Sequence, residues 1–573
     1  MAMKLLVSRT ARRGHRSITS ALHAAAVSRR AAVVRIEPGH YQETLTIRGE
    51  VELVAAGDPG SVVVSASQGT VVAAFGAVRL SGVVLIGRDG DTVFCDGGTL
   101  TIEHSEIRGH SGVSVHAAAG ASVVLRDSVI TRGRAVFAGA VGLVERCRFI
   151  DAADNALAVI EGADVVIRDN WIGNSRIHGI RVSGARARIT GCDLTGTGDS
   201  SISADSRADV TVEDCRITAV HATGISFTEQ SRGSVRDTRV VDAEHGIAVL
   251  NGANPLVQRC VFDECRQSGI NVHSQGLGRF EDCAVVRAGS IAVFSTTGGA
   301  PDVHGCRVSG GNVGVAVVNG RGTFSKIEIR DLTTAALRVL ASATAKFMDV
   351  TVTNCPSGLE SAGDGDTRAE LTDVTFRDFS QAAVTVLGQS RVTLRNTTAE
   401  RGTIGLGVGE SAHLLVRDCD VTDVELVGTL VMGEARLTAT NLTVTRSRGF
   451  GLQGQDSTYL DVTDSEFIDS TLAGVSLNDS CGGVLARCSV TGSEGVAVVD
   501  NGRVRLVDFR SSLPITEQVA KPALDAPATI IQNFYGPVFN AAVEGVQLAW
   551  NNEKVVQHGA KPSHEAGPTD TTT

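Results

Sequence analysis

The sequence has few of the side chains that proteins use to grip sugar rings, nucleic acids or membranes. Aromatic residues make up only 4% of its 573 positions, so stacking platforms for sugars are scarce. The net charge of −10 leaves no basic footprint, and we expect no nucleic-acid partner. No stretch reaches the roughly 18 apolar residues of a membrane span, so we expect no membrane partner. The N-terminal segment 1–30 also contains no apolar run that suits a signal-peptide core.

Cysteine is present 12 times, but without the spacing that disulfides or metal sites show. No Cys-x-x-Cys pair and no Cys/His ligand pattern occurs, so we expect no metal and no cofactor. Free thiols in this number suit a reducing, cytoplasmic location. Eight of them occupy one slot of a repeating pattern and are expected to be buried as small apolar residues. They are Cys147, Cys192, Cys215, Cys260, Cys283, Cys306, Cys419 and Cys488.

Glycine is abundant, with 64 residues, and it opens a repeated phrase in the middle of the chain. The phrase reads Gly-Ile-Ser-Phe at 224–227, Gly-Ile-Ala-Val at 246–249 and Gly-Ile-Asn-Val at 269–272. Its isoleucines, Ile225, Ile247 and Ile270, recur with a period of about 22 residues. Short alternating apolar pieces with such a period are typical of a β-solenoid, in which each repeat is one coil.

The same leading slot can be followed outward over most of the chain. This gives roughly 20 coils, which would stack about 4.8 Å apart into a rod about 100 Å long. The slot is assigned to Val71, Val93, Val113, Val136, Leu157, Ile180, Ile202, Ile225, Ile247, Ile270, Ile291, Val315, Leu337, Leu359, Val384, Leu406, Leu430, Leu452, Val475 and Val496.

The two ends of the array are expected to differ from its middle. A strand from Lys4 to Ser8 and a helix from about Ser17 to Val27 would cover the open edge of the first coil. Proline-rich residues that lose the period follow the array. We therefore divide the chain into a cap with the first coil (1–50), the repeat array (51–510), a linker (511–528), a separate short segment (529–558) and a disordered tail (559–573).

The opening of the array resembles a known family. Residues 32–47, with Pro-Gly-x-Tyr-x-Glu at 38–43, are similar to the start of pectate-lyase-like proteins, notably pectin methylesterases and related repeat proteins. Together with the coils, the resemblance covers residues 1 to about 510. It implies an all-β fold, the right-handed parallel β-helix, and it is shared by enzymes and non-enzymes.

The catalytic signatures of that family do not transfer to this sequence. Pectin methylesterases carry Gln-Asp-Thr-Leu and Val-Asp-Phe-Ile-Phe-Gly, whereas the nearest motif here is Asp-Thr-Val-Phe at 91–94 without its partner. The Asn-Thr-Asp, Asp-Asp and Gly-His-Gly set of polygalacturonases is missing, as is the Asp-Pro-His of alginate epimerases. The resemblance therefore assigns no catalytic residue.

Titratable residues gather loosely on three successive coils and provide the only candidates for catalysis. They are Asp205, His221 and His245, with Asp199, Asp209 and Glu244 nearby. General acid–base chemistry needs paired groups within hydrogen-bond reach. The offsets of these residues within the repeat do not match, so solvated turn residues are the alternative reading to an active or metal site.

Two stretches are candidates for binding and assembly. An outward slot of the middle coils predicts an apolar stripe for a protein partner, unless that slot turns inward at a corner; it comprises Leu250, Phe294, Val318, Leu340 and Leu387. The segment 529–558 resembles bacterial amyloid signalling motifs and predicts a self-stacking β-arch, with a C-terminal cap as the alternative. Its motif residues are Gln532, Phe534, Tyr535, Val546, Gln547 and Trp550.

Two functions follow from these patterns. The first is a non-catalytic β-helix scaffold that presents a long surface to a protein or carbohydrate ligand and assembles through its C-terminal segment. The second is a polysaccharide-active enzyme, a lyase, epimerase or esterase with a divergent site. The missing motifs and the near-constant coil length, which provides no loop-walled cleft, favour the first.

Overall fold

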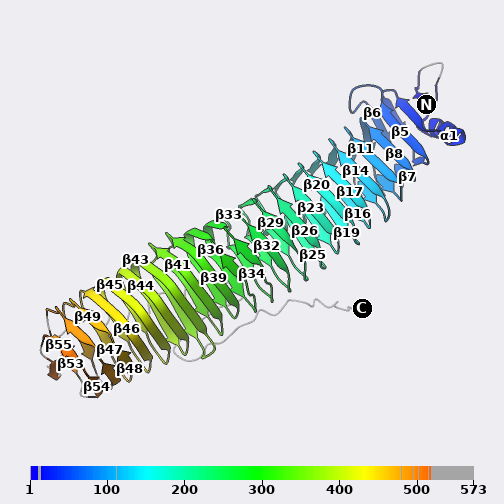
Figure 1. The fold of residues 1–573 in the computed structure, drawn as a ribbon. Coiled ribbons are helices and arrows are strands. Elements are labelled where there is room, and N and C mark those ends of the chain that lie inside the picture. The colour runs from blue at the N-terminus through cyan, green and yellow to red at the C-terminus, as the bar shows by residue number, and fades with distance from the viewer. Residues whose placement is uncertain are drawn as a thin grey trace, which may run out of the picture. The chain divides into compact units, whose positions relative to one another are not determined.

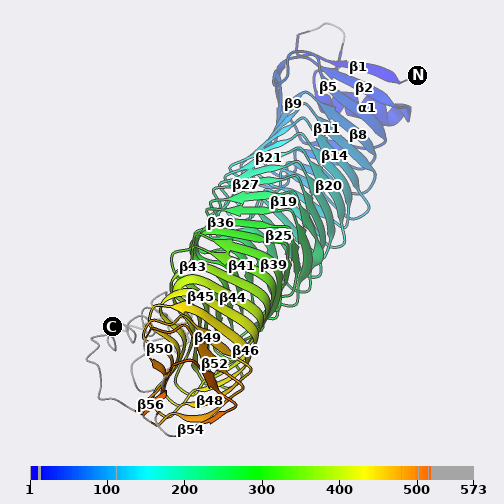
Figure 2. The same cartoon turned by 60° about the vertical axis from the view of Figure 1, so that its left-hand side comes forward.

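The computed structural model describes residues 2–10, 14–110, 112–478, 480–494, 496–500, 503–513 and 515–517. The chain divides into two units, Met1–Gln518 and Val519–Thr573, and all described residues lie in the first. That unit is an all-β solenoid of about 20 turns, as the repeat predicted. Each turn contributes a strand to three parallel sheets, which we call sheets A, B and C (Figures 1 and 2).

Sheet A contains the strands that carry the leading slot. Its separate strands are β4 (Leu45–Ile47), β7 (Val72–Ala74), β10 (Val93–Cys95), β13 (Val115–Ala117), β16 (Ala135–Ala138), β19 (Leu157–Ile160), β22 (Ile180–Ser183), β25 (Ile202–Asp205), β28 (Thr223–Phe227), β31 (His245–Val249), β34 (Ser268–Val272), β40 (Ala335–Leu340), β42 (Ser357–Gly363), β47 (Phe450–Gly454), β50 (Ala473–Leu477), β53 (Val496–Asp500) and β56 (Ile515–Glu517).

Sheet B follows sheet A in each coil after a tight turn. Its separate strands are β1 (Met3–Val7), β2 (Ala32–Ile36), β5 (Glu50–Ala55), β8 (Ala77–Ser81), β11 (Thr99–Glu103), β14 (Ser122–Arg126), β17 (Val141–Glu145), β20 (Asp164–Arg168), β23 (Arg186–Thr190), β26 (Asp209–Glu213), β29 (Arg232–Arg236), β32 (Asn254–Gln258), β35 (Arg279–Glu281), β37 (Asp302–His304), β48 (Tyr459–Thr463), β51 (Gly482–Ala486) and β54 (Val504–Val507).

Sheet C closes each coil with a short strand. Its separate strands are β3 (Gly39–Gln42), β6 (Val62–Ser65), β9 (Val83–Ile86), β12 (Glu106–Arg108), β15 (Val129–Thr131), β18 (Arg148–Ile150), β21 (Trp171–Gly173), β24 (Asp193–Thr195), β27 (Arg216–Thr218), β30 (Arg239–Val241), β33 (Val261–Asp263), β49 (Glu466–Ile468), β52 (Ser489–Thr491) and β55 (Arg510–Ser511).

From residue 284 onward several strands run through a corner and belong to more than one sheet. They are β36 (Ala284–Thr296), β38 (Arg307–Val318), β39 (Arg321–Arg330), β41 (Thr344–Thr353), β43 (Arg368–Gly388), β44 (Arg391–Val408), β45 (His413–Val431) and β46 (Arg436–Ser447).

The leading slot is confirmed for most coils, and at six it is displaced by one or two residues. Strand register places Val72, Val115, Ala135, Val293, Thr429 and Val498 there instead of Val71, Val113, Val136, Ile291, Leu430 and Val496. At Val115, Val293 and Val498 the displacement is two residues, so the expected and the observed residue lie on the same face and alternation does not choose between them. At Val72, Ala135 and Thr429 it is one residue, because adjacent apolar residues such as Val71 and Val72 compete for the slot. A run that is apolar on both faces does not fix its register by alternation.

The N-terminal cap is confirmed. Helix α1 (Ile18–Ser28) begins after the N-cap Ser17, and its apolar side packs against β1, β2 and β4. Glu43, the acid of the Pro-Gly-x-Tyr-x-Glu opening, accepts hydrogen bonds from the backbone N–H groups of Ile18 at 3.0 Å and Thr19 at 2.8 Å. The motif therefore fixes the cap to the first coil, because a carboxylate satisfies N–H groups that have no partner within the helix.

The array extends beyond its expected end at residue 510. β55 pairs with β52 and β56 pairs with β53, so the first residues of the expected linker 511–528 still form coil strands. The remaining linker residues, the segment 529–558 and the tail 559–573 lie outside the described residues. The described part of the chain contains no helix with the length and hydrophobicity that a membrane span needs.

Cysteines fill the interior, as the shared slot predicted. All 12 are free and buried. In the slot, each thiol donates to the carbonyl oxygen two residues earlier, as Cys147 does to Glu145 at 3.3 Å. Burial raises the pKa of the Cys147 thiol to about 12, so this cysteine stays protonated and unreactive at neutral pH.

The residue before this slot turns the corner between sheets B and C in the left-handed conformation. Asp169, Asp214, Asp282 and Asp418 are turn residues with φ values of 55°, 51°, 54° and 53°. The Asp418 carboxylate accepts a hydrogen bond from Nδ2 of Asn441 on the next coil at 2.8 Å. Side chains at these corners therefore connect successive coils.

Candidate functional site

Asp205 lies at the end of β25 on the outer side of sheet A and is only 7% exposed. Its carboxylate accepts from Arg181 Nε at 2.9 Å, from Ser206 Oγ at 3.0 Å and from the Ser183 hydroxyl. Arg181 and Ser183 lie on the preceding strand, β22, in register with Ser203 and Asp205. The oxygens of the Asp205 carboxylate are therefore already occupied by donors from the preceding coil and from its own turn.

These contacts decide the protonation state of Asp205. Burial acts to raise its pKa, but the hydrogen bonds from Arg181 and Ser183 and the Arg181 charge together hold the pKa below its usual range. A carboxylate with a lowered pKa and occupied oxygens is a poor general base at neutral pH. The arrangement indicates a structural ion pair between two coils.

Replacing Asp205 with Asn should cost about 1–3 kcal/mol near pH 7, because the amide leaves the donors of Arg181 and the serines only partly satisfied. The folded-state pKa is depressed, so this stabilisation is present above the unfolded pKa and is lost as pH falls through the folded pKa. Thermal melting of both proteins between pH 7 and pH 3 measures the difference, which should shrink on acidification.

Asp209→Asn is the matched control for that experiment. Asp209 pairs with Arg232 at a longer 3.5 Å, and both side chains are at least 36% exposed. Exposed pairs of this kind contribute about 0–1 kcal/mol. Equal melting of the Asp205 variant and wild type at pH 7 would refute the structural role.

His221 and Glu244 line the same groove of about 740 Å³ at the corner between sheets C and A, together with Asp242, Arg266 and other residues. Arg266 donates to the carbonyl oxygens of Val220 at 2.8 Å and His221 at 2.6 Å, and so holds the groove backbone.

The other candidates lie outside this lining. Asp199 accepts from its neighbour Ser200, Asp209 begins β26 in sheet B, and His245 begins β31 in sheet A. Together with Asp205 they do not form one site, because they fall at different places in their coils. Within the described ranges no three His, Cys, Asp or Glu side chains form a group that could hold a metal ion.

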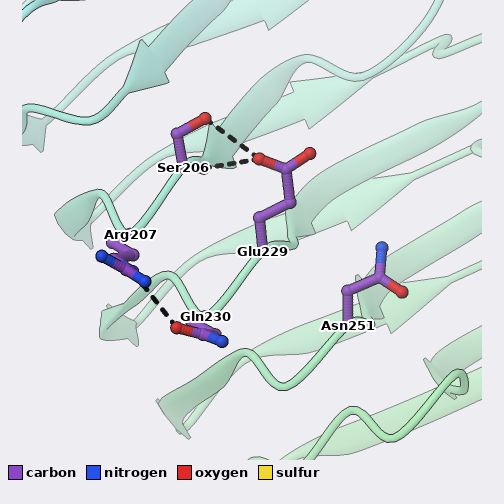
Figure 3. Close-up of a pocket in the computed structure, with 5 residues that line it drawn as sticks. All are labelled: Ser206, Arg207, Glu229, Gln230 and Asn251. Carbon is purple, nitrogen blue, oxygen red and sulfur yellow. Dashed lines mark hydrogen bonds between the residues drawn. The ribbon is translucent and has the colours of Figure 1, made fainter.

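A second hollow of about 560 Å³ lies at the turn between sheets A and B, next to Asp205. Figure 3 shows how Glu229 reaches the turn of the preceding coil, where it accepts from Ser206 N at 3.2 Å and Ser206 Oγ at 3.0 Å. Beside it, Arg207 Nε donates to Gln230 Oε1 at 3.2 Å. The polar side chains here bond to one another across the coils, and none forms a pair suited to proton transfer.

The five residues of the expected apolar stripe do not form a single row across the strands of sheet A. Four of them each follow an inward-facing valine by one position: Leu250 follows Val249, Val318 follows Val317, Leu340 follows Val339 and Leu387 follows Val386. Phe294 instead lies in register with Asn271 and Ala316, one position before the inward row. Leu250 is half-buried, and the other four are at most 8% exposed, so no solvent-exposed stripe is found. From β34 to β50 both faces of several sheet A strands are buried, so position in the alternation does not predict exposure there. A binding role for these residues stays a prediction.

The assembly residues Gln532, Phe534, Tyr535, Val546, Gln547 and Trp550 lie outside the described residues, and their role also stays a prediction. Sequence reasoning missed another surface because it considered the net charge of the whole chain and not the spacing of its arginines. Arg368 and Arg391 are separated by one coil, and Arg436 continues the same series. A spacing equal to the coil period was the available signal.

The comparison with solved structures finds similarity at low sequence identity and low TM-score. The PL6 family alginate lyase AlyGC is 9% identical, with 89% of this chain and 100% of that chain covered and a TM-score of 0.27. The pectate lyase Pel9A is 11% identical, with 56% and 78% covered and a TM-score of 0.21. A mutant of the periplasmic alginate epimerase AlgG is 11% identical, with 63% and 78% covered and a TM-score of 0.25. A search of the curated proteins found no match.

The family comparison covers most of the solenoid. The model of the right-handed β-helix region matches residues 68–187, 178–331 and 357–509. These ranges span most of the coils from β7 to β54 and carry the inward-facing apolar slots of all three sheets. The chain therefore belongs to the right-handed β-helix family.

Proposed function

We propose that the protein is a non-catalytic β-helix scaffold whose outer surface binds a protein or carbohydrate ligand, with assembly through residues 529–558 as part of the same role. The observation that carries the proposal is the engagement of its buried carboxylates. Asp205 is held by Arg181, Asp263 by Arg239 and Arg287, and Glu145 by arginines of three coils. An acid in such a pair connects coils and is not available as a proton acceptor.

Near-constant coil length supports the same proposal. Successive sheet A strands follow one another at an almost unchanged interval through the middle of the array, as Ile202, Ile225, Ile247 and Ile270 do. Coils of equal length provide no long loop to wall a catalytic cleft. A stack of equal coils instead offers a long, regular surface, which suits a binding scaffold.

One observation favours a polysaccharide-active enzyme as the second candidate. His221 and Glu244 line one groove with Asp242 and Gln267, so a histidine and two carboxylates lie near one another at the surface. Such residue types can serve as general acid and base when a substrate brings them into reach. Such a site would differ from the catalytic motifs named in the sequence analysis, and it lies at a corner between two sheets.

Assays of polygalacturonate and alginate turnover by the full-length protein test the proposal. We expect no release of reducing ends or unsaturated uronates above the buffer control. Turnover that is lost in Asp205→Asn, His221→Ala or His245→Ala, but kept in Asp302→Asn, would overturn it. Asp302 is a suitable control because its side chain is 54% exposed and it lies on sheet B.

A further inference from the structure

Arginines form a compact group on the outer side of sheet B. Arg368, Arg391, His413, Arg436 and Tyr459 occupy the same position on five successive coils. Four residues further along their strands, Arg395 and Arg417 also lie side by side. All five arginines are exposed. We call Arg368, Arg391, Arg395, Arg417 and Arg436 the arginine face.

Nearer the N-terminus, several arginines of the same sheet pair with a carboxylate of a neighbouring coil, as Arg79 does with Glu103 at 2.5 Å, Arg126 with Glu145 at 3.3 Å and Arg186 with Asp164 at 3.5 Å. Arg35 and Arg188 form no ion pair within the described residues, but no arginine lies opposite either of them on a neighbouring strand. In the part of the chain that the structure describes, no residue of the arginine face forms an ion pair. Its one recorded side-chain contact is that of Arg436, whose guanidinium lies 4.8 Å from the ring centre of Tyr459.

Acidic side chains lie near this face, but none forms an ion pair with it in the described part of the chain. Glu370 and Asp461 occupy the row between the two arginine rows, and Glu370 pairs with Lys346 at 3.2 Å. In the turns before the face, Glu410 accepts a hydrogen bond from the Gly388 N–H at 2.6 Å and Asp456 accepts one from the Gly433 N–H at 2.9 Å. Burial, and after it the charges of Arg436 and Arg391, lower the pKa of His413, which lies between these two arginines. Like charges directly opposite one another on neighbouring strands cost stability. A partner that carries negative charge would remove this cost.

We propose that the arginine face binds an acidic segment of a partner protein, in extended conformation along the strands. This inference rests on the proposed scaffold function and names its partner class. Arg391 and Arg395 are four residues apart on one strand, which corresponds to about 13 Å. An extended segment has the same rise per residue, so its acidic side chains at positions i and i+4 reach both guanidinium groups. Each arginine can then hold a carboxylate through two parallel hydrogen bonds.

Charge and composition favour a short acidic segment over other anions. Elsewhere on sheet B, carboxylates such as Glu103 and Asp164 lie beside the arginines, and the whole chain carries −10, so a long polyanion such as duplex DNA is repelled beyond the face. Aromatic stacking, which strengthens the binding of sugar rings, has little to offer here, because the ring beside the face, Tyr459, is already engaged with Arg436.

Fluorescence anisotropy of a labelled octaglutamate peptide with the full-length protein tests the proposal. We expect binding that weakens with added salt. Replacing the five arginines of the face with Gln should weaken it about tenfold or more. The control replaces Arg186, Arg188, Arg232, Arg279 and Arg321, on the same sheet, with Gln, and this equal loss of charge should change the affinity less than about twofold.

Three results would overturn the inference: no binding by wild type, equal loss in both variants, or tighter binding of duplex DNA or polygalacturonate than of the peptide. If the fivefold variant does not fold by circular dichroism, the Arg391→Gln and Arg395→Gln pair alone should still lower the affinity. Failure here leaves the scaffold proposal standing, because that proposal is decided by turnover and this one by peptide binding.

Discussion

Gly428→Val is expected to destabilise the array by about 3 kcal/mol or more, because a side chain at this position has no space. A Cβ atom there would lie 2.6 Å from the carbonyl oxygen of Gly451 and 2.2 Å from Cγ1 of Val444. Gly405 and Gly451 meet the next coil in the same way, at 2.3 Å and 2.5 Å from the oxygens of Gly428 and Gly474. These glycines therefore let successive coils approach to strand-pairing distance.

The loss should be local before it is global. Each coil of a solenoid contacts only its neighbours, so a break at one coil uncouples the two parts of the array. Hydrogen exchange on the intact protein should show lost protection over residues 405–474 and a lower melting temperature. Gly482→Val is the control, since a Cβ at Gly482 meets nothing within 4 Å. Wild-type exchange in the Gly428 variant would contradict the packing argument.

The period of the sequence was sufficient for the fold and for the cap. Isoleucines that recur once per coil predict a solenoid, Ser17 before an apolar helix predicts its N-cap, and the structure confirms both. Register was harder. At Thr429 and Leu430, for example, apolar residues continue on both sides of the slot, so alternation could not separate inside from outside.

The candidate site was predicted less well, because it depends on which side chains of different coils meet. Asp205 was selected as a titratable residue near two histidines, but its contacts are with Arg181 and Ser183 one coil earlier. Whether an acid faces a cation or solvent depends on the register between neighbouring strands, because a shift of one residue moves its side chain to the other face. The arginine face shows the same dependence, since its residues form a group only after the coils are aligned.

Phe347→Ala should be nearly as damaging as the glycine substitution, with a loss of about 3–5 kcal/mol. Phe347 points inward from β41, and its ring stacks on that of Phe324 in the preceding coil, with 5.1 Å between centroids and 17° between planes. Leu371 follows it on the next coil, and all three side chains are fully buried. Removing the ring leaves a cavity that straight, hydrogen-bonded coils cannot close by collapsing, because their spacing is fixed by strand pairing.

Urea unfolding and hydrogen exchange of the full-length variants Phe347→Ala and Met348→Ala compare the loss of a buried side chain with the loss of an exposed one on the same strand. Met348 is the next residue of the same strand and is 44% exposed, so its truncation should change the stability by less than about 0.5 kcal/mol. A long array does not unfold in one step, so the midpoint of the coils around Phe347 is the quantity to compare. If protection falls first between residues 324 and 371, coupling is between neighbouring coils; if all coils lose protection together, the array is one cooperative unit and the nearest-neighbour argument for Gly428 fails with it.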